Sequence, residues 1–117
     1  MKVRNLLVNG IVLGATVATL TGIAASYVWA DDAAKGIYDD KCAACHGPTG
    51  KGDGPAGAAL PTKPSDLSTS LKGKDDNYIT KIVKGGGEAV GKSSSMPANS
   101  DLTDDQIKSL VDYIKHL

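Results

Sequence analysis

The stretch Cys42-Ala43-Ala44-Cys45-His46 decides the fold, because it brings two thiols and an imidazole together within one short segment. It stands at the end of residues 33–45, where the spacing of the apolar residues predicts a helix. Residues three and four apart lie on the same face of a helix. The two thiols and the imidazole can therefore act together on one bound group.

This spacing is the pattern of covalent haem attachment, in which two thioether bonds hold the porphyrin and the adjacent imidazole binds the iron. It predicts one haem c, attached through Cys42 and Cys45 and ligated by His46. A covalent porphyrin would also supply apolar surface to a chain that is only 4% aromatic and contains no Phe. Small domains usually need such support beyond their own core.

The cysteine pair has three other possible uses. A thioredoxin-type dithiol is expected near a strand, and no segment after residue 30 shows sustained alternation of apolar and polar residues. A structural zinc site needs four ligands, for which only Cys42, Cys45, His46 and the distant His116 are available. A simple disulfide is common in exported proteins, but it would leave the small core unexplained.

A second feature supports the haem interpretation. Ser95-Met96-Pro97 contains the single methionine that follows residue 30, and it lies 50 residues after His46. Cytochromes c commonly bind iron through a histidine and a methionine. We therefore expect Met96 to be the sixth iron ligand, the alternative being a gap-filling side chain beside a five-coordinate iron.

The first 30 residues have the features of an export signal. Lys2 and Arg4 precede a mostly apolar run from residue 6 to residue 30, which contains no charge and ends Val28-Trp29-Ala30. A basic start, an apolar middle and a small-residue end predict a signal peptide over residues 1–30 and a periplasmic location. The alternative is an uncleaved anchor in the inner membrane facing the periplasm, since about 20 apolar residues suffice to span a bilayer.

Residues 31–117 are expected to form one domain. They carry 11 lysines against 13 acidic residues, which argues against nucleic-acid binding. Residues 47–71 and 85–97 are rich in Gly, Pro, Ser and Thr and are predicted to be loops. A middle helix is expected over residues 75–84. The last helix begins after Thr103, which forms a capping-box pattern with Gln106. The fold class predicted is all-α.

Taken together, residues 31–117 resemble the class I monohaem c-type cytochromes, in particular the small bacterial periplasmic ones. Tyr38 and Ala34 match positions of the family where the N- and C-terminal helices cross, and Leu110 and Tyr113 match positions on the last helix. The resemblance implies a small cytochrome c fold, with those two helices crossing and with a middle helix and long loops wrapping one covalently bound haem.

The resemblance also extends to the loops. Gly54-Pro55-Ala56 matches the family segment whose proline carbonyl accepts a hydrogen bond from the ligating imidazole, which implies that Pro55 orients His46. The run from residue 45 to residue 55 is similar to cytochrome subunits and domains of larger redox enzymes. Family members often have Trp or Phe near the haem, and residues 31–117 have neither. Candidates for holding the haem propionates are Lys63, Tyr78 and Lys92.

The function expected is electron transfer and not catalysis. A haem ligated by His46 and Met96 has no free position for a substrate, and it would carry one electron between redox protein partners. We expect a monomer that contacts the membrane only if residues 1–30 are retained. With the domain charge near zero, strong electrostatic steering is not expected. The alternatives are a haem subunit of a membrane redox complex, and a five-coordinate haem enzyme or gas sensor.

Overall fold

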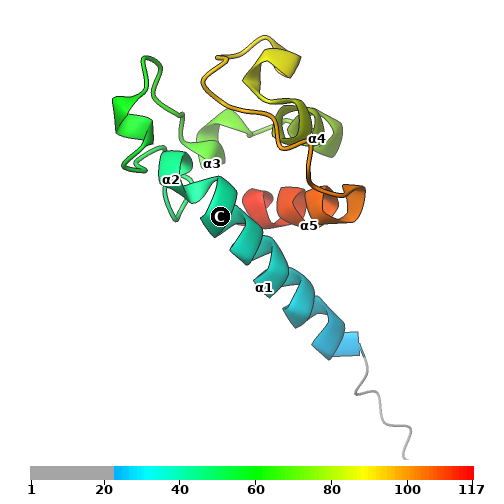
Figure 1. The fold of residues 1–117 in the computed structure, drawn as a ribbon. Coiled ribbons are helices and arrows are strands. Elements are labelled where there is room, and N and C mark those ends of the chain that lie inside the picture. Colours follow the sequence, from blue (N-terminus) through cyan, green and yellow to red (C-terminus); the bar gives the residue numbers. More distant parts are fainter. Residues whose placement is uncertain (1–22) are drawn as a thin grey trace, which may run out of the picture.

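The computed structural model describes residues 23–117, and within that range the chain is helical and contains no strand (Figure 1). This confirms the all-α prediction. The elements are α1 (Ile23–Lys41), α2 (Ala43–His46), α3 (Leu67–Ser70), α4 (Asp76–Gly85) and α5 (Asp104–Lys115), with 3₁₀ turns η1 (Gly57–Ala59) and η2 (Gly87–Val90).

The N-terminal helix differs from the predicted range at both ends. Within the described residues it already runs from Ile23 and not only from near residue 33, so Asp31 and Asp32 lie inside the helix and do not cap it. It also stops at Lys41, because Cys42 departs from helical geometry at φ −119° before α2 begins. The amide of Cys45 bonds to the carbonyl of Cys42 at 3.1 Å, which is the tighter i to i+3 pattern. The predicted single helix is therefore two helices with a break at the first thiol.

The predicted leader lies mostly outside the described residues. Residues 1–22 are not described, and residues 23–30 form the first part of α1, which continues without a break past Ala30. Among residues 23–117, no helix is both long enough and apolar enough to cross a membrane. Cleavage after residue 30 therefore stays a prediction.

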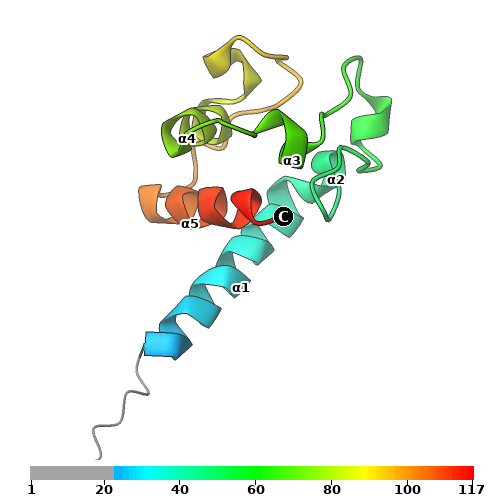
Figure 2. The same ribbon diagram turned by 180° about the vertical axis from the view of Figure 1, so that it is seen from behind.

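Helix α5 crosses the C-terminal half of α1, as Figure 1 and Figure 2 show from opposite sides. Tyr38 and Leu110 are fully buried at this crossing, and the ring centroids of Tyr38 and Tyr113 are 5.5 Å apart. Ala34 is also buried, with 1% exposed. Its small side chain allows the helices to approach closely. The helix crossing that the resemblance implied is confirmed.

Helix α4 packs against α5 and completes the core. Its amphipathic pattern buries Ile79 and Val83, as the predicted helix over 75–84 requires. The buried cluster consists of Tyr38, Ile79, Val83, Leu102, Ile107, Leu110, Val111 and Ile114. Burial of such side chains contributes about 1.5–3 kcal/mol each, so this cluster, drawn from three helices and the turn before α5, positions the rest of the chain.

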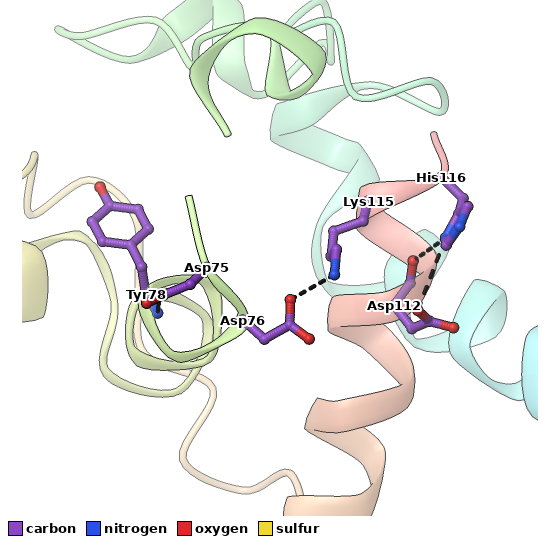
Figure 3. Close-up of polar contacts among 6 residues, drawn as sticks. All are labelled: Asp75, Asp76, Tyr78, Asp112, Lys115 and His116. Carbon is purple, nitrogen blue, oxygen red and sulfur yellow. Dashed lines mark hydrogen bonds and ion pairs between the residues drawn. The ribbon is translucent and has the colours of Figure 1, made fainter. Parts of the chain in front are cut away.

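Side chains fix where these helices begin and how α4 and α5 lie. The capping box of α5 is confirmed, since Thr103 Oγ1 accepts from the Gln106 amide at 3.2 Å and Gln106 Oε1 accepts from the Thr103 amide at 2.9 Å. In Figure 3, Lys115 at the end of α5 pairs with Asp76 at the start of α4, at 2.6 Å. Lys84 near the end of α4 pairs with residue 104 at the start of α5. The two helices are therefore antiparallel and joined at both ends.

Candidate haem site

A cavity of about 380 Å³ opens between the helices and the long loops. Its volume lies within the range of about 300–1,000 Å³ that is usual for cofactor pockets. Cys42, Cys45, His46 and Met96 all line it. The structure therefore brings the four residues predicted to hold the haem to one cavity. Most of the other lining is apolar and includes Leu60, Leu67, Leu71, Ile79, Ile82, Val83 and Ile114.

The segment that carries the thiols is fixed through its backbone. The Cys42 amide bonds to the Tyr38 carbonyl at 2.8 Å, and the His46 amide bonds to the Cys42 carbonyl at 2.9 Å. Gly47 then ends α2 at φ +80°, a left-handed conformation that glycine adopts without strain. The Tyr38 hydroxyl donates to the Gly47 carbonyl at 2.7 Å. The fully buried Tyr38 thus ties the end of α2 to the helix crossing.

The following loop packs directly on this segment. The Gly54 amide bonds to the Cys45 carbonyl at 3.2 Å, and the Ala56 amide bonds to the Ala44 carbonyl at 2.9 Å. A Cβ atom at Gly54 would lie 2.6 Å from the backbone carbonyl carbons of both Ala44 and Cys45. Such a contact is too close for any side chain. The glycines at 54 and 57 are the sequence signal of this close approach, since a Cβ at Gly57 would also lie 2.4 Å from the Cys45 carbonyl oxygen.

The imidazole of His46 is partly buried, with one ring nitrogen unsatisfied. Its Nδ1 atom is buried and has no hydrogen-bond partner among the described residues. Burial lowers the pKa of the ring below its usual value, which favours the neutral form that binds metals. An orphaned buried ring nitrogen beside two half-buried thiols fits the chemistry of a haem site.

The hydrogen bond expected between His46 and the Pro55 carbonyl is not formed in the described structure. Pro55 itself is exposed in a turn. The amides on either side of Pro55, those of Gly54 and Ala56, bond to the carbonyls of Cys45 and Ala44. These contacts hold the loop against α2.

The cysteines do not have the surroundings of a redox dithiol or a zinc site. Both thiols are free and partly buried, and burial raises the pKa of Cys42 to about 11. A thiol in such surroundings stays protonated, which disfavours thiolate chemistry. No strand adjoins the pair, and no group of three His, Cys, Asp or Glu is placed to hold a metal ion within residues 23–117.

Met96 is positioned by the end of α4. Its carbonyl accepts from the Gly87 amide at 3.0 Å, and a Cβ at Gly86, which has φ +76°, would lie 2.7 Å from that same oxygen. Further along, both the backbone amide and the side-chain amide of Asn99 donate to the Val83 carbonyl. The predicted loop over 85–97 therefore contains the short turn η2 and is closed onto α4 by its glycines.

The remaining candidates divide between the cavity and the surface. Lys63, Tyr78 and Lys92, proposed for the propionates, all line the cavity. His116 lies exposed at the end of α5, where its Nδ1 is 2.7 Å from the Asp112 carbonyl (Figure 3). The structure thus places His116 outside the cavity, on the molecular surface.

The chain was compared with known proteins. The cytochrome c family model matches residues 32–117. The Cbb3-type cytochrome c oxidase subunit CcoP of Azospirillum brasilense is 34% identical over 84 residues, covering 71% of this chain and 27% of that protein. The CcoP of Azospirillum sp. (strain B510) is 38% identical over 105 residues, covering 86% of this chain and 33% of that protein.

The chain thus spans a third or less of the length of these curated relatives. No solved structure matches it significantly. The family match covers nearly all of the described residues. It includes Cys42, Cys45 and His46, which line the cavity. The chain belongs to the cytochrome c family and is a haem electron-transfer protein whose haem c is covalently attached at the Cys42 and Cys45 spacing.

Proposed function

We propose that this protein carries single electrons between redox partners on a haem ligated by both His46 and Met96. The observation that carries the proposal is the lining of one cavity by these two side chains together with Cys42 and Cys45. The two ligands come from different parts of the chain. α2 and the segment after η2 are separate parts of the fold in Figure 1 and Figure 2.

The residues of the chain prepare the site for electron transfer and not for substrate binding. The bound haem supplies a one-electron couple. His46 offers a neutral ring nitrogen and Met96 offers a thioether sulfur, so neither brings a charge into the cavity. When both bind, no position on the metal is open to a substrate. A thioether ligand raises the reduction potential, and we expect a positive value.

The apolar lining supports the same role. Leu67, Leu71 and Ile82 are partly buried side chains that pack against the core and also face the cavity. Such a lining excludes water from a bound haem. A low local dielectric disfavours extra charge on the metal and raises the potential further. The thioether ligand and the apolar lining would thus both favour the reduced state of the haem.

An absorbance spectrum of the oxidised holoprotein tests the ligation. Sulfur-to-iron ligation gives a weak near-red band, which we expect in the natural protein. Met96→Leu keeps the volume of the side chain but removes the donor, so the band should disappear and carbon monoxide should bind the reduced protein. Ser94→Ala, at an exposed position two residues away, is the matched control and should keep the band. Persistence of the band in Met96→Leu would contradict ligation by Met96, and absence of the band from the natural protein would favour the five-coordinate alternative.

The proposed location is the periplasm, with residues 1–30 removed and the domain monomeric. The basic start and apolar run of those residues support export. Determination of the N-terminal residue in the soluble fraction tests this. A chain that begins near Asp31 agrees with the proposal, and a chain that begins at Met1 contradicts it.

A second candidate is a haem subunit of a membrane redox complex. Two observations favour it: the relatives are named as oxidase subunits, and α1 continues unbroken from Ile23 past the expected cleavage site. Washed membranes would then retain the full-length chain after high-salt extraction. Release of all the haem-stained protein by osmotic shock would rule this candidate out.

A further inference from the structure

Tyr38 and Tyr113 form a chain of contacts that leads from the cavity to another surface of the molecule. Tyr38 lines the cavity, whereas Tyr113 does not. Their ring centroids lie 5.5 Å apart and the ring planes are tilted by 54°, within the range of about 4.5–7 Å that is usual for aromatic rings in contact. Tyr38 is fully buried, and Tyr113 is partly exposed. The pair therefore spans the distance from the cavity to solvent at the crossing of α1 and α5 (Figure 1, Figure 2).

The inner end of this chain is joined to the expected iron ligand. The Tyr38 hydroxyl donates to the Gly47 carbonyl at 2.7 Å, and Gly47 directly follows His46 in the chain. A phenylalanine ring would fill the same space at the helix crossing, and a buried hydroxyl costs free energy unless it is hydrogen-bonded. The hydroxyl thus adds a bonded connection between the ring and the backbone of His46, which the packing of the two helices does not require.

The outer end lies beside an exposed histidine at the end of α5. The His116 amide bonds to the Tyr113 carbonyl at 3.0 Å, and residues three apart are neighbours on a helix surface. The His116 side chain is exposed (Figure 3). Across the crossing, the exposed Lys35 of α1 is neutralised by its ion pair with Asp39. A molecule that docks at this crossing therefore reaches Tyr113 without entering the cavity.

We propose that the Tyr38–Tyr113 pair is a second electron route, which connects the haem to a redox partner docked at the crossing of α1 and α5. The inference rests on the proposed electron-transfer function. Electrons tunnel more readily through bonded and contacting atoms than across gaps, and here a hydrogen bond and two touching rings provide such atoms. The rings keep their own electrons and protons and act only as the bridge. The carrier can thus exchange electrons with one partner at the cavity and with another at Tyr113.

A competing route through α5 has to be separated from this one. Ile114 lines the cavity and adjoins Tyr113 in the chain, so an electron can also pass through this aliphatic side chain and the helix backbone. That path uses neither aromatic ring and does not use the Tyr38 hydroxyl. Substitutions that change only the rings or the hydroxyl therefore decide between the two routes.

The chain offers a natural position for the measurement. It contains two histidines, and the Nδ1 atom of His46 is buried, so a ruthenium bis(bipyridine) reagent labels the exposed His116. A light flash excites the ruthenium(II) label, which gives one electron to hexaammineruthenium(III) in solution. The ruthenium(III) label then takes one electron from the reduced holoprotein, whose iron becomes iron(III). The haem absorbance gives the rate of this intramolecular transfer.

The expected effects follow the route. Tyr113→Leu removes the outer ring and should lower the rate several-fold, whereas Tyr113→Phe keeps the ring and should keep the rate. Tyr38→Phe breaks the bond to the Gly47 carbonyl and should also lower the rate. The control carries the label on α4, in His116→Gln/Lys81→His, at an exposed position that does not line the cavity. There Tyr113→Leu should leave the rate unchanged. The reduction potential should be the same with and without Tyr113→Leu.

The other outcomes would overturn the proposal. An unchanged rate from the label on His116 in Tyr113→Leu would leave the path through Ile114 as the route. An equal fall at both label positions, or a shifted reduction potential, would show that the substitution acts on the haem site as a whole. If Tyr113→Leu does not retain haem, Tyr38→Phe decides alone, and a natural rate in that variant would refute the route. Failure of either label to receive an electron would instead contradict the electron-transfer function itself.

Discussion

Replacing Gly54 by alanine should loosen the cofactor segment without substituting any residue that binds the haem. The added Cβ would lie 2.6 Å from two carbonyl carbons of the backbone, those of residues 44 and 45, and backbone cannot move aside cheaply. The loop must therefore retreat, and two hydrogen bonds are lost, those of 3.2 Å and 2.9 Å made by the amides of Gly54 and Ala56. At about 0.5–1.5 kcal/mol each, the loss is about 1–3 kcal/mol of unfolding free energy.

Denaturant unfolding of the holoprotein, followed by the haem absorbance, measures this loss. In thermal unfolding, the melting temperature should fall by about 4–8 °C for each kcal/mol lost in a domain of this size. Gly36→Ala is the control, because Gly36 lies in α1 with nothing within 4 Å of a new Cβ. It should stabilise the helix by about 0.5–1 kcal/mol. Equal stability of Gly54→Ala and the natural protein would refute the close approach.

Three further substitutions test the helices α1 and α5 that support the cavity. Leu110→Ala, at a fully buried position of the helix crossing, should cost about 2–5 kcal/mol in denaturant unfolding; a loss below 1 kcal/mol would contradict the crossing. Thr103→Ala removes a cap and should cost about 0.5–2 kcal/mol, detected as a lower melting temperature, whereas Ser100→Ala should not. Burial raises the pKa of Tyr38 to about 12 from its ordinary 10. The protonated hydroxyl therefore favours the folded state below pH 10, and this contribution is lost as the pH rises towards 12. Tyr38→Phe should show a shallower alkaline loss of stability than Tyr113→Phe, and equal slopes would contradict the burial of that hydroxyl.

The fold could be predicted where the sequence pattern of one segment determines the structure of that segment. The capping box at Thr103, the apolar face of α5 and the apolar face of α4 follow from helical periodicity, and the structure confirms them. The cysteine spacing and the position of Met96 predicted a shared cofactor, and the structure brings these side chains to one cavity. These features depend on neighbours in sequence or on a motif.

The features that escaped prediction depend on contacts between distant segments. The break at Cys42 between α1 and α2 is not signalled by a helix-breaking residue in the sequence. The bond expected from His46 to Pro55 is not formed among the described residues, where His46 Nδ1 has no hydrogen-bond partner. The four lysines that line the cavity, Lys41, Lys63, Lys74 and Lys92, could not be grouped from the sequence, since only the folded chain brings them together.

The antiparallel tie between α4 and α5 has a consequence for the energy needed to change oxidation state. Exposed ion pairs such as Lys115–Asp76 contribute little free energy, but they hold α4 in register with α5 while α5 is packed across α1. The segment bearing His46 and the loop bearing Met96 are therefore attached to two ends of one packed frame of helices. A frame that resists relative movement of its ends would keep the structural change small when a haem held by His46 and Met96 gains or loses an electron.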